Sequence, residues 1–288
     1  DFLRTIRRDR RAEVAVLHSL YDFAHELLPT RAYPMHAYLQ AYHHAFKGYL
    51  AIAALLKAGV QAGWLSEEEL LERDGLDGRK AVVLLDVEAM RPEVRRRLEA
   101  FARDGGAVFA DAATTVRLEG ARPLPVNFGE MTELCKRLDA RVMPQVVPVI
   151  ERHVLPLFDR AVRGEALGDL LVTRQVNGQA EYWLVVAERL AETDEKTSLA
   201  LHSKDVNLYR AVETAVTVPA TGVVYDALAG RMVTRAAAAA KVDLKLPPGG
   251  LAVLAVLPEP VGSLRIEAPA SASAGTPAPL RVELRGES

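Results

Sequence analysis

The stretch KAVVLLDVEAMRPEVRRRLEAFARDGGAVFAD, residues 80–111, decides how the first half of this chain folds. Residues 81–85 form an apolar run of the length typical of a strand that is buried on both faces. A proline then opens a helix over 92–103, because proline is favoured in a first helical turn. The Asp-Gly-Gly turn at 104–106 leads into a second apolar strand at 107–110. The stretch therefore predicts strand, helix and strand within one parallel sheet.

Upstream of this stretch the sequence shows the same alternation. Residues 13–19 (EVAVLHS) predict a first buried strand, and a polar and aromatic loop is expected at 20–35. Apolar residues then recur every three or four positions over 36–58, which predicts a long helix. A short strand at 60–65 and a short helix at 67–72 follow. Such alternation predicts a flavodoxin-like α/β fold, a doubly wound and mainly parallel sheet with helices on both faces.

The pattern changes after Gly168, where strands follow one another without intervening helices. Residues 170–176 and 181–187 flank an Asn-Gly pair, which is a strong hairpin signal. Turn signals recur beyond them, and we therefore predict an all-β antiparallel sandwich. Between the two folds, the patterns at 129–138 and 146–162 predict helices. Further strands of the sandwich are predicted at 198–202, 211–218, 222–226, 242–246 and 251–256.

These changes of pattern divide the chain into four parts. We expect residues 1–12 to be a linker from an upstream domain, 13–167 to form the α/β domain and 168–258 to form the sandwich. Residues 259–288 begin with a proline-rich linker and continue with the first strands of a truncated third β-domain. Both ends of the sequence are therefore expected to lie inside a longer polypeptide.

Composition excludes several classes of function. Of the 288 residues, 36 are Lys or Arg and 38 are Asp or Glu, so the formal net charge is only -2. A nucleic-acid-binding protein usually carries a strong basic excess, and we expect no nucleic-acid partner. No apolar run reaches the roughly 18 residues that a membrane span needs. The single cysteine, Cys135, cannot form an intrachain disulfide, and no zinc-binding spacing of Cys and His occurs, so we expect no metal ion.

At this point the sequence resembles a known family. The segments EVAVLHS (13–19), KAGV (57–60) and residues 80–111 together look like the glutamine-amidotransferase-like domain of large glycoside hydrolases, called the trimerisation domain in their β-galactosidases. The segments TGVVYDALAG (221–230) and VDLKLPPGGLAVLAVLPEPV (242–261) are similar to the carboxy-terminal sandwich that follows such domains. The resemblance therefore extends over both predicted folds.

The resemblance implies an accessory role in a carbohydrate-active protein. In such enzymes the acid and nucleophile carboxylates lie in an upstream TIM barrel of about 250 residues, for which there is no room before residue 13. The partner that it implies is an upstream catalytic domain of the same polypeptide. It also allows a homo-oligomer and a bound carbohydrate, and it implies a location outside the cell or in the periplasm.

The sequence lacks the residues that amidotransferase chemistry needs. An activated cysteine should occupy a sharp turn after the strand that ends near Ala110, but residues 111–115 read DAATT. Cys135 falls within a predicted helix and is expected to be a packed thiol. Neither a Gly-x-Gly-x-x-Gly nor a Walker-type motif is present, and the five histidines between His18 and His44 form no metal triad. We therefore predict no catalytic residue and no cofactor.

The remaining candidate site lies at the carboxyl ends of the parallel strands, where open α/β sheets bind ligands. Carboxylates and an aromatic ring suit sugar hydroxyls, but Asp at such positions also caps the following helix or turn. We favour capping and keep a ligand or interface site as the alternative. The aromatic segment 21–38 adds His36, because aromatic residues are enriched in interfaces. The candidate residues are Ser19, Tyr21, Asp22, His36, Asp86, Glu88, Asp111 and Thr114.

Three functions are compatible with these patterns. The first is a non-catalytic accessory or oligomerisation region that braces a catalytic barrel, and the second is a module that binds a carbohydrate or another small polar ligand. The third, ranked last, is an independent hydrolase using Asp22, Asp86 and Asp111, two of which would have to lie about 5–10 Å apart. Of Tyr182 and Trp183, one is expected to face the core of the sandwich, because side chains alternate along a strand.

Overall fold

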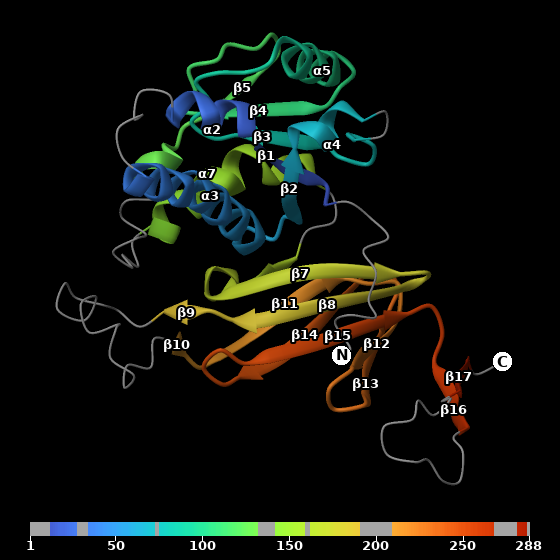
Figure 1. The fold of residues 1–288 in the computed structure, drawn as a ribbon. Helices are drawn as coiled ribbons and strands as arrows, with labels where there is room; N and C mark the ends of the chain where they lie inside the picture. The colour runs from blue at the N-terminus through green and yellow to red at the C-terminus, as the bar shows by residue number, and fades with distance from the viewer. Residues whose placement is uncertain are drawn as a thin grey trace, which may run out of the picture.

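The computed structural model describes residues 12–27, 34–72, 75–131, 142–158, 162–190, 209–267 and 281–286. In these residues a parallel sheet with helices is followed by antiparallel sheets, as Figure 1 shows. The predicted fold class, α/β followed by all-β, is confirmed. No helix within the described ranges is long and apolar enough to cross a membrane.

Five strands form the parallel sheet: β1 (Val14–His18), β2 (Ala62–Ser66), β3 (Ala81–Leu84), β4 (Ala107–Asp111) and β5 (Arg122–Leu124). They lie in the order β2-β1-β3-β4-β5, and every neighbouring pair is parallel. This order is that of flavodoxin-like folds. Strand β2 lies on one side of β1, at the edge of the sheet. Strands β3, β4 and β5 lie on the other side of β1, in chain order.

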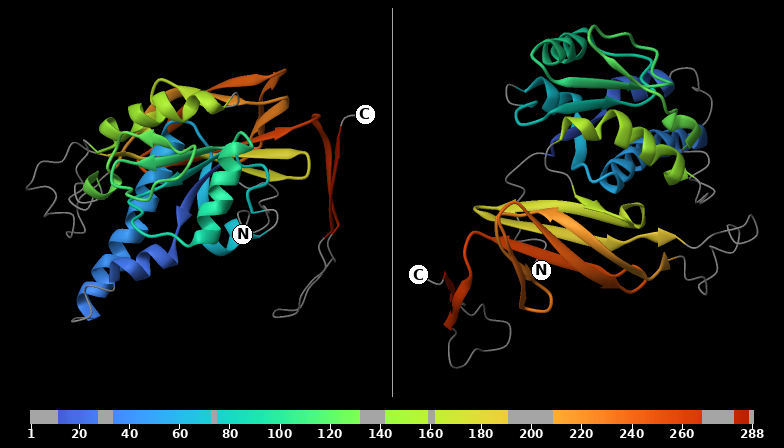
Figure 2. Two further views of the ribbon diagram at one scale, coloured as in Figure 1. Left: turned by 90° about the horizontal axis from the view of Figure 1, so that it is seen from above. Right: turned by 180° about the vertical axis from the view of Figure 1, so that it is seen from behind.

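The helices around this sheet are α2 (Leu20–Leu27), α3 (Pro34–Lys57), α4 (Glu67–Leu71), α5 (Pro92–Arg103) and α7 (Val142–His153). They cover both faces because the strands are apolar on both sides. Val14 and Val16 of β1 belong to the apolar cluster under α3 and α7, whereas Ala15 and Leu17 belong to the cluster under α4 and α5. Helices α3 and α7 contact each other, as Figure 2 shows from behind.

Helix α2 occupies residues for which we predicted a loop. The hydroxyl of Ser19 accepts a hydrogen bond from the backbone N–H of Asp22 at 2.9 Å, and this bond caps the first turn. Ser19 was assigned to the preceding strand in the sequence, so the cap went unrecognised. The loop prediction is wrong for residues 20–27.

Helix α7 begins and ends earlier than the helix predicted at 146–162. Pro144 lies in its first turn, where a missing N–H removes no intrahelical bond. After the helix, Leu155–Leu157 form a 3-10 turn. The helix predicted at 129–138 starts at residue 128, but from residue 132 on it lies outside the described residues, as does Cys135.

Two antiparallel sheets face each other in the second half of the chain. One has the order β13-β12-β15-β8-β7 and the other the order β14-β11-β6. Side chains from both sheets, including Trp183 and Val216, share one apolar cluster. The strands are β6 (Arg163–Gly164), β7 (Leu170–Asn177), β8 (Ala180–Ala187), β11 (Val212–Pro219), β12 (Gly222–Asp226), β13 (Arg231–Ala236), β14 (Ala239–Leu246) and β15 (Leu251–Leu257).

The hairpin predicted from the Asn-Gly pair is confirmed, with Gly178 in the left-handed conformation (φ 57°) that this turn requires. Trp183 is the member of the Tyr-Trp pair that faces the core, with 2% of its surface exposed. Strand β13 was missed because its sequence, RMVTRA, does not alternate between polar and apolar residues. The strand predicted at 198–202 lies outside the described residues.

Two short strand pairs complete the described chain. Strands β9 (Arg189–Leu190) and β10 (Tyr209–Arg210) pair next to the sandwich. Strands β16 (Val261–Glu267) and β17 (Arg281–Gly286) pair antiparallel beyond it.

Candidate functional site at the carboxyl ends of the parallel strands

The candidate residues surround the point between β1 and β3 where the strand order reverses. Ligands of open α/β sheets bind at this point because the loops that follow the two strands diverge there. Here the loop after β1 leads into α2, and the loop after β3 leads toward α5. What the site can do depends on how the side chains of these loops use their hydrogen bonds.

Asp22 joins the two loops. Its side chain is fully buried, and its Oδ1 accepts hydrogen bonds from the backbone N–H groups of Glu88 and Ala89, both at 2.8 Å. Two adjacent N–H groups at the end of a strand would otherwise be available to a bound anion. In this chain the carboxylate of Asp22 accepts these bonds.

Asp111 plays the corresponding role between β3 and β4. Its Oδ1 accepts the backbone N–H of Asp86 at 2.8 Å and both the backbone N–H and the hydroxyl of Thr114, at 2.9 and 2.7 Å. Its Oδ2 accepts the N–H of Phe128 at 3.2 Å. The hydroxyl of Thr114 in turn accepts the N–H of Val87. Asp111 thus caps its own turn, as the preferred interpretation predicted, and also ties two other segments to it.

Asp86 follows β3 and has a left-handed backbone, with φ 53°. It is the single non-glycine residue of the described ranges with positive φ, a conformation that short polar residues tolerate best. Its Oδ2 lies 2.9 Å from the Nζ of Lys47, whose side chain is 1% exposed, whereas that of Asp86 is 27% exposed. A Cβ on Gly129 would lie 3.4 Å from the same oxygen. The partly exposed carboxylate of Asp86 therefore forms an ion pair with the buried ammonium group of Lys47.

Ser19 links β1 to α4. Its hydroxyl donates to Oε1 of Glu67 at 2.8 Å, and the Nε of Arg91 donates to Oε2 at the same distance. Glu67 is buried, and both of its oxygens have a partner. The pKa of the neighbouring Glu68 is lowered from its ordinary value, chiefly because its carboxylate accepts a hydrogen bond from its own backbone N–H.

The other candidates lie apart from this network. The side chain of Tyr21 is exposed, as is that of Glu88, which lies 4.0 Å from Nδ1 of His25. His36 lies in α3, but its side chain is outside the described part of the chain. Among the described residues, no group of three His, Cys, Asp or Glu side chains is arranged to hold a metal ion.

Sequence reasoning missed Lys47, Glu67 and Arg91. A signal existed for Lys47, because it precedes Leu50, Ala51 and Ala54 by three, four and seven positions, which places it on the buried stripe of α3. Glu67 and Arg91 carry no comparable signal. They lie on different elements, and only the fold brings them together.

No family model and no curated protein matches the sequence. Several solved structures are similar to this chain in fold. An α-L-fucosidase from Paenibacillus thiaminolyticus has a TM-score of 0.53 and 11% identity, covering 89% of this chain and 50% of that chain. A β-galactosidase from Bacillus circulans sp. alkalophilus has a TM-score of 0.45 and 14% identity, covering 89% and 42%. An exo-carrageenase GH42 from Bacteroides ovatus has a TM-score of 0.43 and 10% identity, covering 86% and 29%.

These neighbours are all glycoside hydrolases, and this chain spans half or less of each of them. At such low identity a likeness concerns the fold alone. The α-L-fucosidase, with the highest TM-score of the three, is the one that supports a common fold over most of the chain.

Proposed function

We propose that this chain is a non-catalytic accessory and oligomerisation region of a carbohydrate-active, glycoside hydrolase-like protein of the β-galactosidase type, and that it braces an upstream catalytic barrel. The observation that carries the proposal is that carboxylates at the strand ends are already hydrogen-bonded to the backbone of this chain. Asp22 and Asp111 accept backbone N–H groups from neighbouring loops, so they stabilise the fold. In this proposal the α/β domain starts at residue 13 and the sandwich ends at residue 258, and β6 (Arg163–Gly164), which pairs with β11, belongs to the sandwich.

This chain is similar to half of an α-L-fucosidase chain, which supports the proposal that it is a region of a larger protein. Translation of the reading frame upstream of residue 1 tests this directly. We expect a barrel of about 250 residues or more, with two carboxylates at its strand ends. A start codon or an unrelated domain immediately upstream would contradict the proposal.

An activity assay tests the non-catalytic role. We expect the chain alone to hydrolyse no nitrophenyl glycoside, and the parent protein to retain its activity in Asp86→Asn. Substitution of either carboxylate in the barrel should abolish that activity. Turnover by the chain alone that disappears in Asp86→Asn would instead support the independent hydrolase.

Self-association of the parent protein is part of the proposal, with a second copy as the partner. Leu20 and Tyr21 of α2 and Tyr49 of α3 are large apolar side chains exposed to solvent, as is common in interfaces. Sedimentation velocity of the parent protein should show an oligomer that dissociates when these three residues become Ser. A monomeric parent would remove oligomerisation from the proposal.

A location outside the cell or in the periplasm also belongs to the proposal. It follows from the resemblance to exported glycoside hydrolases. Cell fractionation with an antibody against the sandwich should find the parent protein in the medium or the periplasmic fraction. Recovery from the cytoplasmic fraction alone would contradict this location.

A small-ligand module is the second candidate, and Asp86 is the observation that favours it. Left-handed non-glycine residues concentrate at functional sites, and the carboxylate of Asp86 is partly open to solvent. Titration of the chain with galactose and related monosaccharides, followed by NMR, tests this function. Binding that disappears in Asp86→Asn would support the module, whereas unchanged spectra at millimolar sugar would exclude it for these ligands.

A further inference from the structure

The α/β region and the sandwich have separate apolar cores. One core cluster joins β1, α3 and α7, and another joins the two sheets of the sandwich. No apolar cluster of the described residues includes both. Their contact is formed by α3, α7 and the segment before β2 on one side, and by β7 and the segments around it on the other.

The nitrogen and the oxygen of the Gln61 side-chain amide both form hydrogen bonds with β7, at the edge of the sandwich. Its Nε2 donates to the carbonyl of Val172 at 3.1 Å, and its Oε1 accepts the backbone N–H of Arg174 at 2.7 Å. Strand β7 is the outermost strand of its sheet, so these groups point away from β8. One residue of a parallel neighbouring strand would make the same two bonds on either side of Thr173. The amide therefore replaces a strand at this edge.

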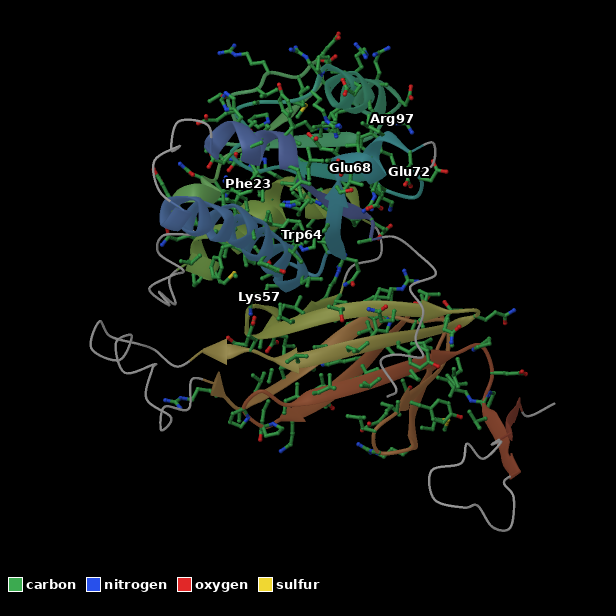
Figure 3. All side chains as sticks on the ribbon, viewed as in Figure 1. Phe23, Lys57, Trp64, Glu68, Glu72 and Arg97 are labelled. Atoms are coloured by element: carbon green, nitrogen blue, oxygen red, sulfur yellow. The ribbon has the colours of Figure 1, made fainter. Side chains whose placement is uncertain are left out.

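Lys57 binds the segments that flank the hairpin of β7 and β8. Its side chain is nearly completely buried, and Figure 3 shows it at the boundary between the two regions. Its Nζ lies 2.8 Å from the carbonyl of Gly168, before β7, and 2.9 Å from Oε2 of Glu188, after β8. Both ends of the hairpin are thus held by one ammonium group.

Gly59 allows the end of α3 to lie close to the backbone of Val162. Its φ is 81°, and a Cβ at this position would lie 2.4 Å from the carbonyl oxygen of Val162. The carbonyl of Gly59 also accepts the N–H of Val162, at 3.4 Å. A residue with a side chain would therefore push the sandwich away from α3.

We propose that Lys57, Gly59 and Gln61 form a clasp that makes the α/β region and the sandwich one cooperative body. The clasp also covers an edge strand whose unpaired N–H and C=O groups would otherwise be open to a strand of another chain. Because the two cores are separate, these polar bonds fix the relative position of the two regions. The inference does not depend on the accessory role.

Residue-resolved hydrogen exchange of the full chain tests the clasp. In Gln61→Ala, exchange at the backbone N–H of Arg174 should become at least roughly tenfold faster, the factor for one lost hydrogen bond. Exchange at Thr173, whose N–H faces β8, should change by less than about twofold. Gln179→Ala, exposed in the turn of the same hairpin, is the matched control and should alter neither. Unchanged exchange at Arg174 in Gln61→Ala would overturn the inference.

Gln61→Glu provides a second test, with the opposite expected result, if Gln61→Ala does not fold. Near neutral pH its carboxylate still accepts the N–H of Arg174 but donates nothing to Val172. We therefore expect Arg174 to remain protected in this variant. Loss of that protection would also overturn the clasp.

The two tryptophans of the chain report on the two regions separately, because Trp64 lies in β2 and Trp183 in β8. Trp183→Phe leaves fluorescence from the α/β region alone, and Trp64→Phe leaves that from the sandwich. With the clasp intact, the two urea transitions should coincide. They should separate when Lys57→Met and Gln61→Ala are combined. Separate transitions with the clasp intact would show that the regions are not coupled and would overturn the inference.

Discussion

The two regions of this chain bury different kinds of side chain. Among the described residues, every buried polar or charged side chain lies in the α/β region: Ser19, Asp22, Lys47, Lys57, Glu67, Arg79 and Asp111. The buried residues in the described part of the sandwich are Val, Leu and Ala with one Trp and one Pro. One chain thus specifies two folds in two ways, the first through buried hydrogen-bond networks and the second through alternating apolar residues.

Backbone hydrogen bonding explains the difference. In an antiparallel sandwich, neighbouring strands and tight hairpins pair most backbone groups, so the inward side chains can all be apolar. At the carboxyl edge of a parallel sheet the loops diverge, and their buried N–H groups need acceptors that no strand supplies. Asp22 and Asp111 supply them for five backbone N–H groups.

The largest effect is expected at the centre of the sandwich. Trp183→Ala removes the largest fully buried side chain and should destabilise this region by about 3–5 kcal/mol. Urea unfolding followed by circular dichroism measures the loss, and Leu228→Ala, at an exposed turn, should change stability little. A loss no greater than that of the control would contradict an apolar core centred on Trp183.

The next largest effect is expected in the α/β region. Asp111→Ala deprives three backbone N–H groups and the Thr114 hydroxyl of their acceptor and should cost about 3 kcal/mol. Trp64 fluorescence in a Trp183→Phe background follows the unfolding of this region. Asp104→Ala, an exposed carboxylate at the end of α5, is the control. Equal stability of the two variants would mean that the network of Asp111 does not support the fold.

The same difference decides what can be predicted from the sequence. Strand β14 (AAKVDLKL) alternates strictly between exposed and buried residues, and residues 81–85 are continuously apolar, so both strands are found from pattern alone. The sequence also placed the strand-end carboxylates at one edge of the sheet. It could not show that Asp22 bonds to Glu88, 66 residues away, because such a partner exists only once the strand order is set. The clasp at Gln61 could not be predicted for the same reason.

A smaller and asymmetric effect is expected at the ion pair that connects this network to the surface. Asp86→Asn keeps a residue that tolerates positive φ but removes the charge that Asp86 places 2.9 Å from the buried ammonium of Lys47, at a cost of about 2 kcal/mol. Lys47→Met should cost only about 1 kcal/mol, because the partly exposed carboxylate of Asp86 can be solvated. Urea denaturation of both variants and of the double variant measures the coupling. A greater loss in Lys47→Met than in Asp86→Asn would reverse this account of which charge is buried.

The smallest effect is expected at the indole N–H of Trp183, a buried polar group in the core of the sandwich. The indole Nε1 of Trp183 is buried without a hydrogen-bond partner, a cost that Phe avoids. Trp183→Phe loses apolar contact, including part of the contact with Arg174, whose guanidinium carbon lies 5.7 Å from the ring centroid. The two contributions oppose each other, so the net loss should be about 1 kcal/mol or less. A loss close to that of Trp183→Ala, measured by urea unfolding of the sandwich, would mean that the indole N–H contributes to stability and that the sandwich too depends on a buried polar group.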